Sequence, residues 1–476
     1  MIAMSFTLVL VVLCASGFWE ESGTRLFEVY GLGSMNMDSI SFRFILLTVW
    51  VMVLCMLVYK GWGSRHGFLK VEKGIVLVGL LVLLTLLFMT QDILYFYILF
   101  EIIVVPVYFL INIWGSREER RVASSYFFIL TLVGSLVMLI SLIQLQLILG
   151  GTLIPYVAFY VRFLLESEEI GLYAVYREKP EFMDLGWFED EMSLEFYLKL
   201  VSMGKGNSSL FVYNWILFGL LLGFAIKLPV YPFHIYLPQA HVEAPLIGSI
   251  LLAGILLKIG GYGFIRFISP MLLWNLFYFL PICLCMGIFN VVYGGLNTLR
   301  QVDGKKLVAY SSVAHMGIVF VALLLKGDES VNASIYLMVA HGFVSSALFT
   351  VVTILYLRFN TRILHYWRGI LMTSPIFVVL FFVLTLANIA FPTTVNFMGE
   401  FISFISIGQQ SSLIFPILAL SLVLSGAYSI YFFNRVAYGQ ISSYMSYARD
   451  VAWSELASLL YVKYFVVILG YSFLNL

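Results

Sequence analysis

The chain is dominated by long, continuously apolar stretches that short polar segments separate. A helix needs about 20 such residues to cross a bilayer, and these stretches have that order of length. They do not alternate apolar and polar residues with a period of two, so they favour helices over a barrel. We therefore predict an all-α polytopic membrane protein with about 13 transmembrane helices, at residues 2–19, 40–59, 74–90, 93–114, 123–149, 211–237, 244–268, 271–294, 307–325, 331–357, 370–407, 413–436 and 454–475.

The charges between these stretches are biased in sign. Acidic residues prevail in 19–39 and in the long loop 150–210, which the helix count places on one side of the membrane. Loops on the cytoplasmic or matrix side are the ones enriched in Lys and Arg. The N-terminus is therefore expected on that basic side, where Lys305 and Lys306 would act as topology determinants. The basic loops are 60–73, 115–122, 295–306 and 358–369.

Two of the stretches are expected to be broken near their middle. Lys227 lies two residues before Pro229, and proline both kinks a helix and leaves a backbone carbonyl free. The stretch 370–407 is too long for one straight crossing and contains Pro392, followed by Glu400. Broken helices inside a membrane are tolerated only where they face protein or a wet cavity.

The two broken stretches lie five spans apart, so the units that contain them would have opposite orientations in the membrane. Inverted repeats of this kind are typical of secondary transporters. We predict two inverted five-helix repeats with two discontinuous helices, one in each repeat. The predicted division is N-terminal helices 1–73, a first unit 74–268, a second unit 271–436 and a C-terminal helix 437–476.

Ionisable side chains within the spans are the candidates for chemistry. A lysine at the bilayer centre costs roughly 2.5–3.5 kcal/mol, yet Lys227 and Lys258 lie in neighbouring spans. Glu101 lies near the centre of another span, either as a stabilising partner of a neighbouring helix or as a proton or ion site. His315 and His341 lie in consecutive spans, where the alternatives are interhelical hydrogen bonds and a proton relay.

Composition and motifs argue against several other functions. The chain is 62% hydrophobic and 11% charged, against about 25% charged residues in soluble domains. Its net charge is +1, and no basic tract indicates nucleic-acid binding. There is no CxxC pair, HExxH motif or Gly-rich nucleotide loop, so we expect no nucleotide, flavin, metal or iron–sulfur cluster on this chain. The loop 150–210 has a soluble-like composition and is either a solvated insertion or a surface for a partner.

Five segments of the chain carry a resemblance to a known family. They are FEIIVVPVYFLINIWGSRE from residue 100, KLPVYPFHIYLPQAHVEAPLIGSILLAGILLKIGGYGFIRF from residue 227, LRQVDGKKLVAYSSVAHMG from residue 299, AHGFVSSALF from residue 340 and FMGEF from residue 397. Over residues 90–440 the chain resembles the antiporter-like proton-pumping subunits of respiratory complex I. The block LPQAHVEAP followed by LAGILLKIGGYG is long and specific.

The resemblance implies proton translocation coupled to quinone reduction in a distant arm of a larger complex, a proton-pumping NADH:ubiquinone oxidoreductase. Flavin, iron–sulfur clusters and quinone would then be held by partner subunits. The resemblance also gives each candidate residue a place in the family's proton path. Glu101 takes the place of the glutamate of the first half-channel, Lys227 that of the broken-helix lysine, Lys258 that of the central lysine, His315 and His341 those of polar-axis positions, and Glu400 that of the terminal carboxylate of the second half-channel.

The chain also departs from the family. Members usually have one more span, so we expect that a first helix is missing here, and the loop 150–210 is longer than usual. A cation/proton antiporter subunit and a membrane-bound hydrogenase subunit stay open as alternatives on the same scaffold. Expected partners are other complex I membrane subunits, lipids and, at loop 150–210, accessory subunits. The aromatic-rich, alanine-poor composition favours the mitochondrial inner membrane over a bacterial plasma membrane.

Overall fold

The computed structural model describes residues 26–28, 34–61, 67–149, 207–269, 276–325, 327–444 and 450–474. Within these ranges the chain is helical apart from connecting segments and one short antiparallel ribbon. The ribbon pairs β1 (Leu26–Glu28) with β2 (Ser34–Asn36). The predicted helical membrane fold is confirmed for the described part of the chain, whereas the predicted span 2–19 and the loop 150–210 lie outside it.

Nine helical segments of the described ranges are long and apolar enough to cross a membrane, so the chain is a multi-pass membrane protein. Each predicted span from 40–59 onward overlaps a helix, with its ends shifted by a few residues. The uninterrupted helices are α2 (Ser39–Gly61), α3 (Gly67–Met89), α6 (Arg120–Leu149), α14 (Leu276–Arg300), α15 (Gly304–Leu324), α16 (Asp328–Phe359), α19 (Ile414–Ala437) and α20 (Trp453–Leu474).

The first predicted break lies where Pro229 indicates it. Helix α9 (Asn207–Lys227) ends two residues before this proline, and the chain resumes in the short 3₁₀ helix η2 (Phe233–Ile235) and in α10 (Tyr236–Glu243). Proline has no N–H to continue the hydrogen-bond ladder, so a carbonyl of the last turn is left over. The Tyr236 hydroxyl donates to the Ile226 carbonyl at 2.8 Å and satisfies it.

The second predicted break is also present. Helix α17 (Pro375–Asn388) ends before Pro392, and α18 (Val395–Gln410) begins after it. The Asn388 amide donates to Ser429 Oγ at 3.0 Å, which ties the end of α17 to α19. Both discontinuous helices are therefore confirmed, and both place an ionisable residue within about two turns of the break.

Two interruptions were not predicted from the sequence. The span 93–114 divides at Ile103 into α4 (Ile93–Ile102) and α5 (Val104–Trp114), since the ring of Pro106 excludes a normal helical hydrogen bond to the preceding turn. The span 244–268 was expected to be regular, yet it contains two π-helical segments. It runs through α11 (Leu246–Leu251), η3 (Leu252–Leu256), α12 (Leu257–Gly263) and η4 (Phe264–Ile268).

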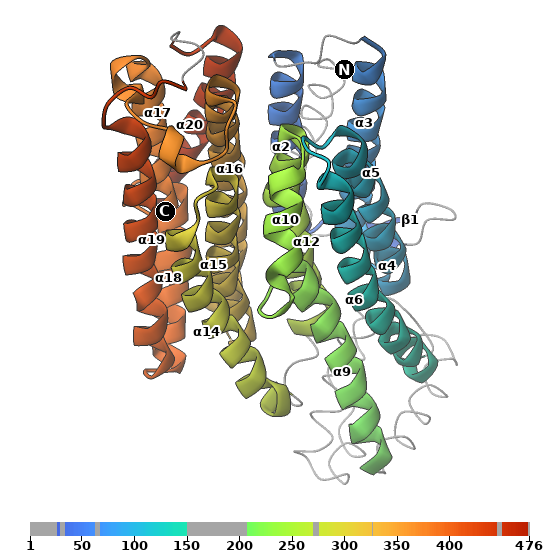
Figure 1. Ribbon diagram of the computed structural model, residues 1–476. Coiled ribbons are helices and arrows are strands. Elements are labelled where there is room, and N and C mark those ends of the chain that lie inside the picture. The colour runs from blue at the N-terminus through green and yellow to red at the C-terminus, as the bar shows by residue number, and fades with distance from the viewer. Residues whose placement is uncertain are drawn as a thin grey trace.

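The helices form one bundle with a buried centre. Figure 1 shows α3 to α12 gathered on one side and α14 to α19 on the other. The spans of α15 and α16 are each 94% buried and the span Leu246–Ile268 is 89% buried, whereas α19 is 28% buried. Polar groups on these three buried spans are therefore shielded from any lipid, which is the condition that charges in a membrane require.

Three basic loops meet at one end of the bundle, as the charge pattern predicts. Ser116 N donates to Glu243 O at 3.2 Å, and Gly304 N donates to Arg362 O at 3.0 Å. Leu364 N donates to Val302 O and the Arg362 guanidinium group donates to Ser116 Oγ, so the connections α5–α6, α14–α15 and α16–α17 lie together. We call this the basic end of the bundle. Helices α9, α14 and α19 begin, and α18 ends, toward the opposite end (Figure 1).

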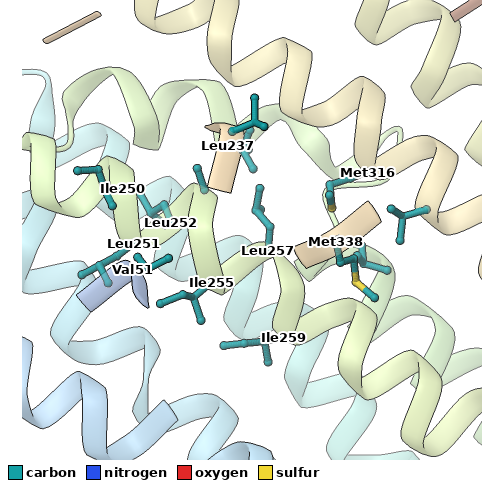
Figure 2. Close-up of a cluster of buried hydrophobic side chains, with 14 of the residues drawn as sticks. Val51, Leu237, Ile250, Leu251, Leu252, Ile255, Leu257, Ile259, Met316 and Met338 are labelled. Atoms are coloured by element: carbon teal, nitrogen blue, oxygen red, sulfur yellow. The ribbon is translucent and has the colours of Figure 1, made fainter. Parts of the chain in front are cut away.

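An apolar cluster fills the centre between α2, the span Leu246–Ile268, α15 and α16 (Figure 2). Leu257 and Ile259, the neighbours of Lys258 in the sequence, are part of it, together with Met316 and Met338. Lys258 is thus embedded in hydrocarbon on its own helix, and its ammonium group has to find polar partners on other segments. The predicted division into units 74–268 and 271–436 stays a prediction. The discontinuous helix is the fourth helix of each.

Candidate functional site

The centre of the site is a contact between Lys258 on α12 and His341 on α16. Both side chains are buried, with exposed fractions of 0% and 2%. Lys258 Nζ lies 2.8 Å from His341 Nδ1 and also donates to the Ala253 carbonyl. Ala253 lies in the π-helical segment η3, whose wider turn departs from the normal ladder. The π-helical segment, which the sequence did not predict, therefore supplies the carbonyl that binds the lysine.

The polar row continues from His341 into the second discontinuous helix. The imidazole rings of His341 and His315 lie 5.6 Å apart, centroid to centroid. His315 Nδ1 lies 2.9 Å from Glu400 Oε1, and His315 Nε2 lies 3.4 Å from the Tyr428 hydroxyl. Four of the predicted residues thus form a continuous buried row, which we call the central row: Lys258, His341, His315 and Glu400.

We call the Glu400 end of the central row its outer end. Polar atoms at this end lack hydrogen-bond partners. The contact between His315 Nδ1 and Glu400 Oε1 is short, but the carboxylate lies off the direction of a ring N–H. Neither atom has a hydrogen-bond partner among the described residues. A cavity of about 10 Å³ adjoins them, between α14, α15, α18 and α19, close to the size that one water needs. This end of the row therefore offers two unpartnered polar atoms to the cavity.

Lys227 occupies a second polar position, at the end of α9. Its side chain is 8% exposed, and its Nζ lies 4.1 Å from the centre of the Phe100 ring. It lines a cavity of about 20 Å³ together with Tyr236 and His241, enough for about one water. The helix break therefore leaves a small cavity beside the lysine.

Glu101 lies on α4, directly before the interruption at Ile103. It is half-buried, and its Oε1 has no hydrogen-bond partner among the described residues. Glu101 forms no direct ion pair with Lys227, although the two charges interact at longer range. The expected Glu101–Lys227 pair is therefore not a direct ion pair in this structure.

The two halves of the site approach each other at Gly260. A methyl group on Gly260 would lie 3.0 Å from the Leu228 backbone nitrogen and 3.1 Å from Lys227 Cβ. The missing side chain lets the break after Lys227 pack directly on α12, two residues beyond Lys258. This close approach connects the first polar position with the central row.

His241 is a site residue that the sequence reasoning did not select. It is fully buried, stacks on Phe349 with ring centroids 4.7 Å apart, and has no hydrogen-bond partner at either ring nitrogen among the described residues. It lines the cavity of Lys227 and interacts electrostatically with Lys258 and His341. Its place directly after the predicted break, in LPQAHVEAP, was the available signal.

A cluster of buried charges lies at the basic end. Arg362 Nη1 lies 2.9 Å from Glu243 Oε1, and a second guanidinium nitrogen donates to Ser116 Oγ. Lys305 donates to the Ala244 carbonyl at 3.1 Å and is 3% exposed. Lys305 is thus a buried structural cation, whereas Lys306 is exposed as a topology determinant would be.

The arrangement suits proton transfer between fixed side chains. Within the described ranges, no group of three or more His, Cys, Asp or Glu side chains is placed to hold a metal ion. The central row instead alternates groups that can each carry one proton: an amine, two imidazoles and a carboxylate. Separations of 2.8 and 2.9 Å at its two ends are within reach of direct or water-assisted transfer.

Comparisons with known proteins agree with this architecture. The family described as "NADH:quinone oxidoreductase/Mrp antiporter, TM" matches residues 90–176 and 184–425. NADH-ubiquinone oxidoreductase chain 4 of Metridium senile is 41% identical over 92% of this chain and 79% of its own length. The protein of the same name from Chondrus crispus is 35% identical over 99% of this chain and 87% of its own length.

Solved structures show the same fold. A chain of respiratory complex I from Thermus thermophilus with bound NADH superposes with a TM-score of 0.78 at 24% identity, covering 98% of this chain and 89% of that chain. A chain of the Mrp complex from Dietzia gives a TM-score of 0.78 at 15% identity, covering 99% of this chain and 89% of that chain. At these identities the likeness concerns the fold alone.

Proposed function

Because the chain belongs to the NADH:quinone oxidoreductase/Mrp antiporter family of membrane proteins, we propose that it translocates protons as a core membrane subunit of a proton-pumping NADH:ubiquinone oxidoreductase. The observation that carries this proposal is the central row. Four ionisable side chains from α12, α15, α16 and α18 lie next to one another in a continuous row, inside a bundle whose other core residues are mostly apolar.

The proton path begins at the basic end. Protons pass from there to Glu101 and Lys227, and the water-sized cavity beside Lys227 leads toward α12. Lys258 then passes the charge to His341 and His315, and Glu400 receives it at the outer end of the row. The separated Glu101–Lys227 pair lets the lysine release its proton without first breaking a tight ion pair.

Charge state moves along the row by electrostatic coupling. When Lys258 is protonated and His341 is neutral, the ammonium group can donate to His341 Nδ1 across their 2.8 Å contact. Transfer of that proton places an imidazolium next to His315 and favours release of a proton from His315 to Glu400. Two unit charges 4 Å apart interact by about 4 kcal/mol at an effective dielectric constant of about 20. An interaction energy of this size is enough for a proton transfer at one residue to favour the transfer at the next residue of the row.

The redox chemistry is proposed to lie outside this chain. Flavin, iron–sulfur clusters and quinone would be held by partner subunits, with other membrane subunits of the complex on either side. The proposed location is the mitochondrial inner membrane, because the curated relatives are named for an oxidoreductase that uses ubiquinone. Loop 150–210 is proposed as a contact for accessory subunits, and lipid would cover the exposed apolar faces of helices such as α19.

The fold alone does not separate this function from cation/proton antiport, because the Mrp complex shares it. Identity of 35–41% over most of the chain with relatives named NADH-ubiquinone oxidoreductase chain 4 favours the oxidoreductase. Purification in mild detergent distinguishes the two. NADH-oxidising, flavin-containing partners are expected to co-purify, and a free homo-oligomer would contradict the proposal.

The path itself is tested by Lys227→Ala and Glu101→Ala. Each variant is expected to abolish proton pumping by the complex in sealed vesicles, while the assembled complex persists on native gels. Lys306→Ala is the control, since the Lys306 side chain is 42% exposed and its Nζ lies 3.9 Å from Asp303 Oδ2 in the adjoining loop. Full pumping in either Lys227→Ala or Glu101→Ala would refute the proposed path.

A further inference from the structure

The small cavity beside Glu400 is lined by a polar side chain, Ser421, that the proton path described so far does not use. Besides His315 and Glu400, polar side chains of α19 line this cavity. They are Ser421, Ser425 and Tyr428. Ser421 is 7% exposed, and its hydroxyl has no hydrogen-bond partner among the described residues. Buried hydroxyl groups almost always have a partner, because an unsatisfied one is destabilising. The cavity is close to the size that one water needs, and a water there would be a partner for this hydroxyl group.

The neighbouring hydroxyl groups differ from Ser421 in this respect. Ser425 Oγ donates to the Leu422 carbonyl at 3.0 Å. On α18, Ser403 Oγ donates to the Glu400 carbonyl at 2.7 Å and Ser406 Oγ donates to the Ser403 carbonyl at 2.9 Å. These hydroxyl groups are engaged within their own helices. The one unengaged hydroxyl that lines the cavity, among the residues described, is that of Ser421.

Ser421 also lies farther from the basic end than Glu400 does. Glu400 is ten residues before the end of α18, and Ser421 is seven residues after the start of α19. At a rise of about 1.5 Å per residue these positions are about 15 Å and about 10 Å from the opposite end of the bundle. Ser425 and Tyr428 lie deeper along α19. Ser421 is therefore the outermost polar group of the cavity.

We propose that Ser421 positions the first water of the proton outlet beyond Glu400, an inference that rests on the proton path proposed above. The water would lie between Glu400 Oε1 and Ser421 Oγ, which are unpartnered among the described residues, as is His315 Nδ1 in the same cavity. When Glu400 is protonated, its carboxyl O–H bond breaks and the water gains the proton. The water then gives a proton to the next water outward, so that one proton leaves and Glu400 returns to the carboxylate. Ser421 stays unchanged and holds the water in line.

The test compares side chains of equal shape with and without the hydroxyl group. Ser421→Thr keeps the hydroxyl, whereas Ser421→Val has the shape of threonine and lacks it, and Ser421→Ala is the simple deletion. Ser425→Ala removes the engaged hydroxyl one turn away and is the matched control. Proton pumping by the intact complex is measured in sealed vesicles during NADH oxidation, per assembled complex.

Ser421→Val and Ser421→Ala are expected to lower the pumping rate about threefold to tenfold, the change that loss of one net hydrogen bond produces. Ser421→Thr and Ser425→Ala are expected to stay within about twofold of the native rate, by the same scale. The infrared difference band of the Glu400 carboxyl group, identified by its loss in Glu400→Gln, is expected to shift in Ser421→Val. It should not shift in Ser421→Thr. A role in packing alone would not separate these two variants.

Equal pumping rates and equal infrared bands in Ser421→Val and Ser421→Thr would overturn this inference. Glu400→Gln, measured in parallel, separates the two levels of the account. If Glu400→Gln stops pumping while Ser421→Val pumps normally, only the outlet is wrongly placed. If Glu400→Gln pumps normally as well, the proposed proton path itself is wrong.

Discussion

At the scale of single residues, the folded structure identifies buried polar side chains that the hydropathy of the sequence alone does not reveal. Lys258, His341, His315 and Glu400 were recognisable because ionisable groups stand out inside apolar spans, and the structure brings these four into one row. His241 was not selected, because it lies in a short polar segment that sequence pattern places near a loop. Its burial comes from packing between α10 and its neighbours, which no local pattern encodes.

Arg362 illustrates the same limit and supports a stability prediction. The sequence places it in a basic loop, yet it is 1% exposed and paired with the buried Glu243. Arg362→Gln leaves the Glu243 carboxylate buried without its cation, which typically costs about 3–5 kcal/mol. We expect a clear loss of thermal stability of the assembled complex. The measurement is the rate of NADH oxidation that remains after heating. Arg368→Gln, at an exposed position of the same loop, should change stability by no more than about 0.5 kcal/mol. Equal inactivation curves for the two variants would contradict this role of Arg362.

At the scale of helices, proline and span length predicted two of the interruptions, whereas the one at Ile103 was missed although Pro106 follows it. The breaks after Lys227 and before Glu400 follow from Pro229 and Pro392. The π-helical segments around Lys258 carry no comparable signal, because they contain no proline. Only the packing of this span, and the carbonyl that Lys258 finds at Ala253, reveal them.

Helix spacing gives a prediction at Gly260. A methyl group there would press on the backbone of Leu228 and on Lys227 Cβ, at 3.0 and 3.1 Å. Gly260→Ala is therefore expected to destabilise the bundle by about 1–3 kcal/mol and to lower proton pumping by moving the break away from α12. Gly79→Ala is the control, because a methyl group on Gly79 would meet no atom within 4 Å. Thermal inactivation and pumping are measured on both variants. The account of this contact fails if Gly260→Ala matches Gly79→Ala in both.

At the scale of the whole molecule, the charged loops and the apolar spans were enough to predict the membrane fold. The basic loops do meet at one end, through hydrogen bonds such as Gly304 to Arg362. What the sequence could not supply is the order of contacts across the bundle. The central row joins α12, α15, α16 and α18, whose side chains lie up to 142 positions apart in the chain, from Lys258 to Glu400. Only the folded bundle brings these separate candidates into one row.

The most direct test of that path is the number of protons pumped per NADH oxidised by the complex that carries Glu400→Gln. The measurement is made in sealed vesicles beside the native complex and Glu329→Gln, a control at an exposed carboxylate. The amide keeps the shape of the side chain but cannot take up and release the proton that reaches the outer end of the central row. The account predicts a lower proton-to-NADH ratio in Glu400→Gln alone, with the complex fully assembled. A native ratio in Glu400→Gln would contradict it.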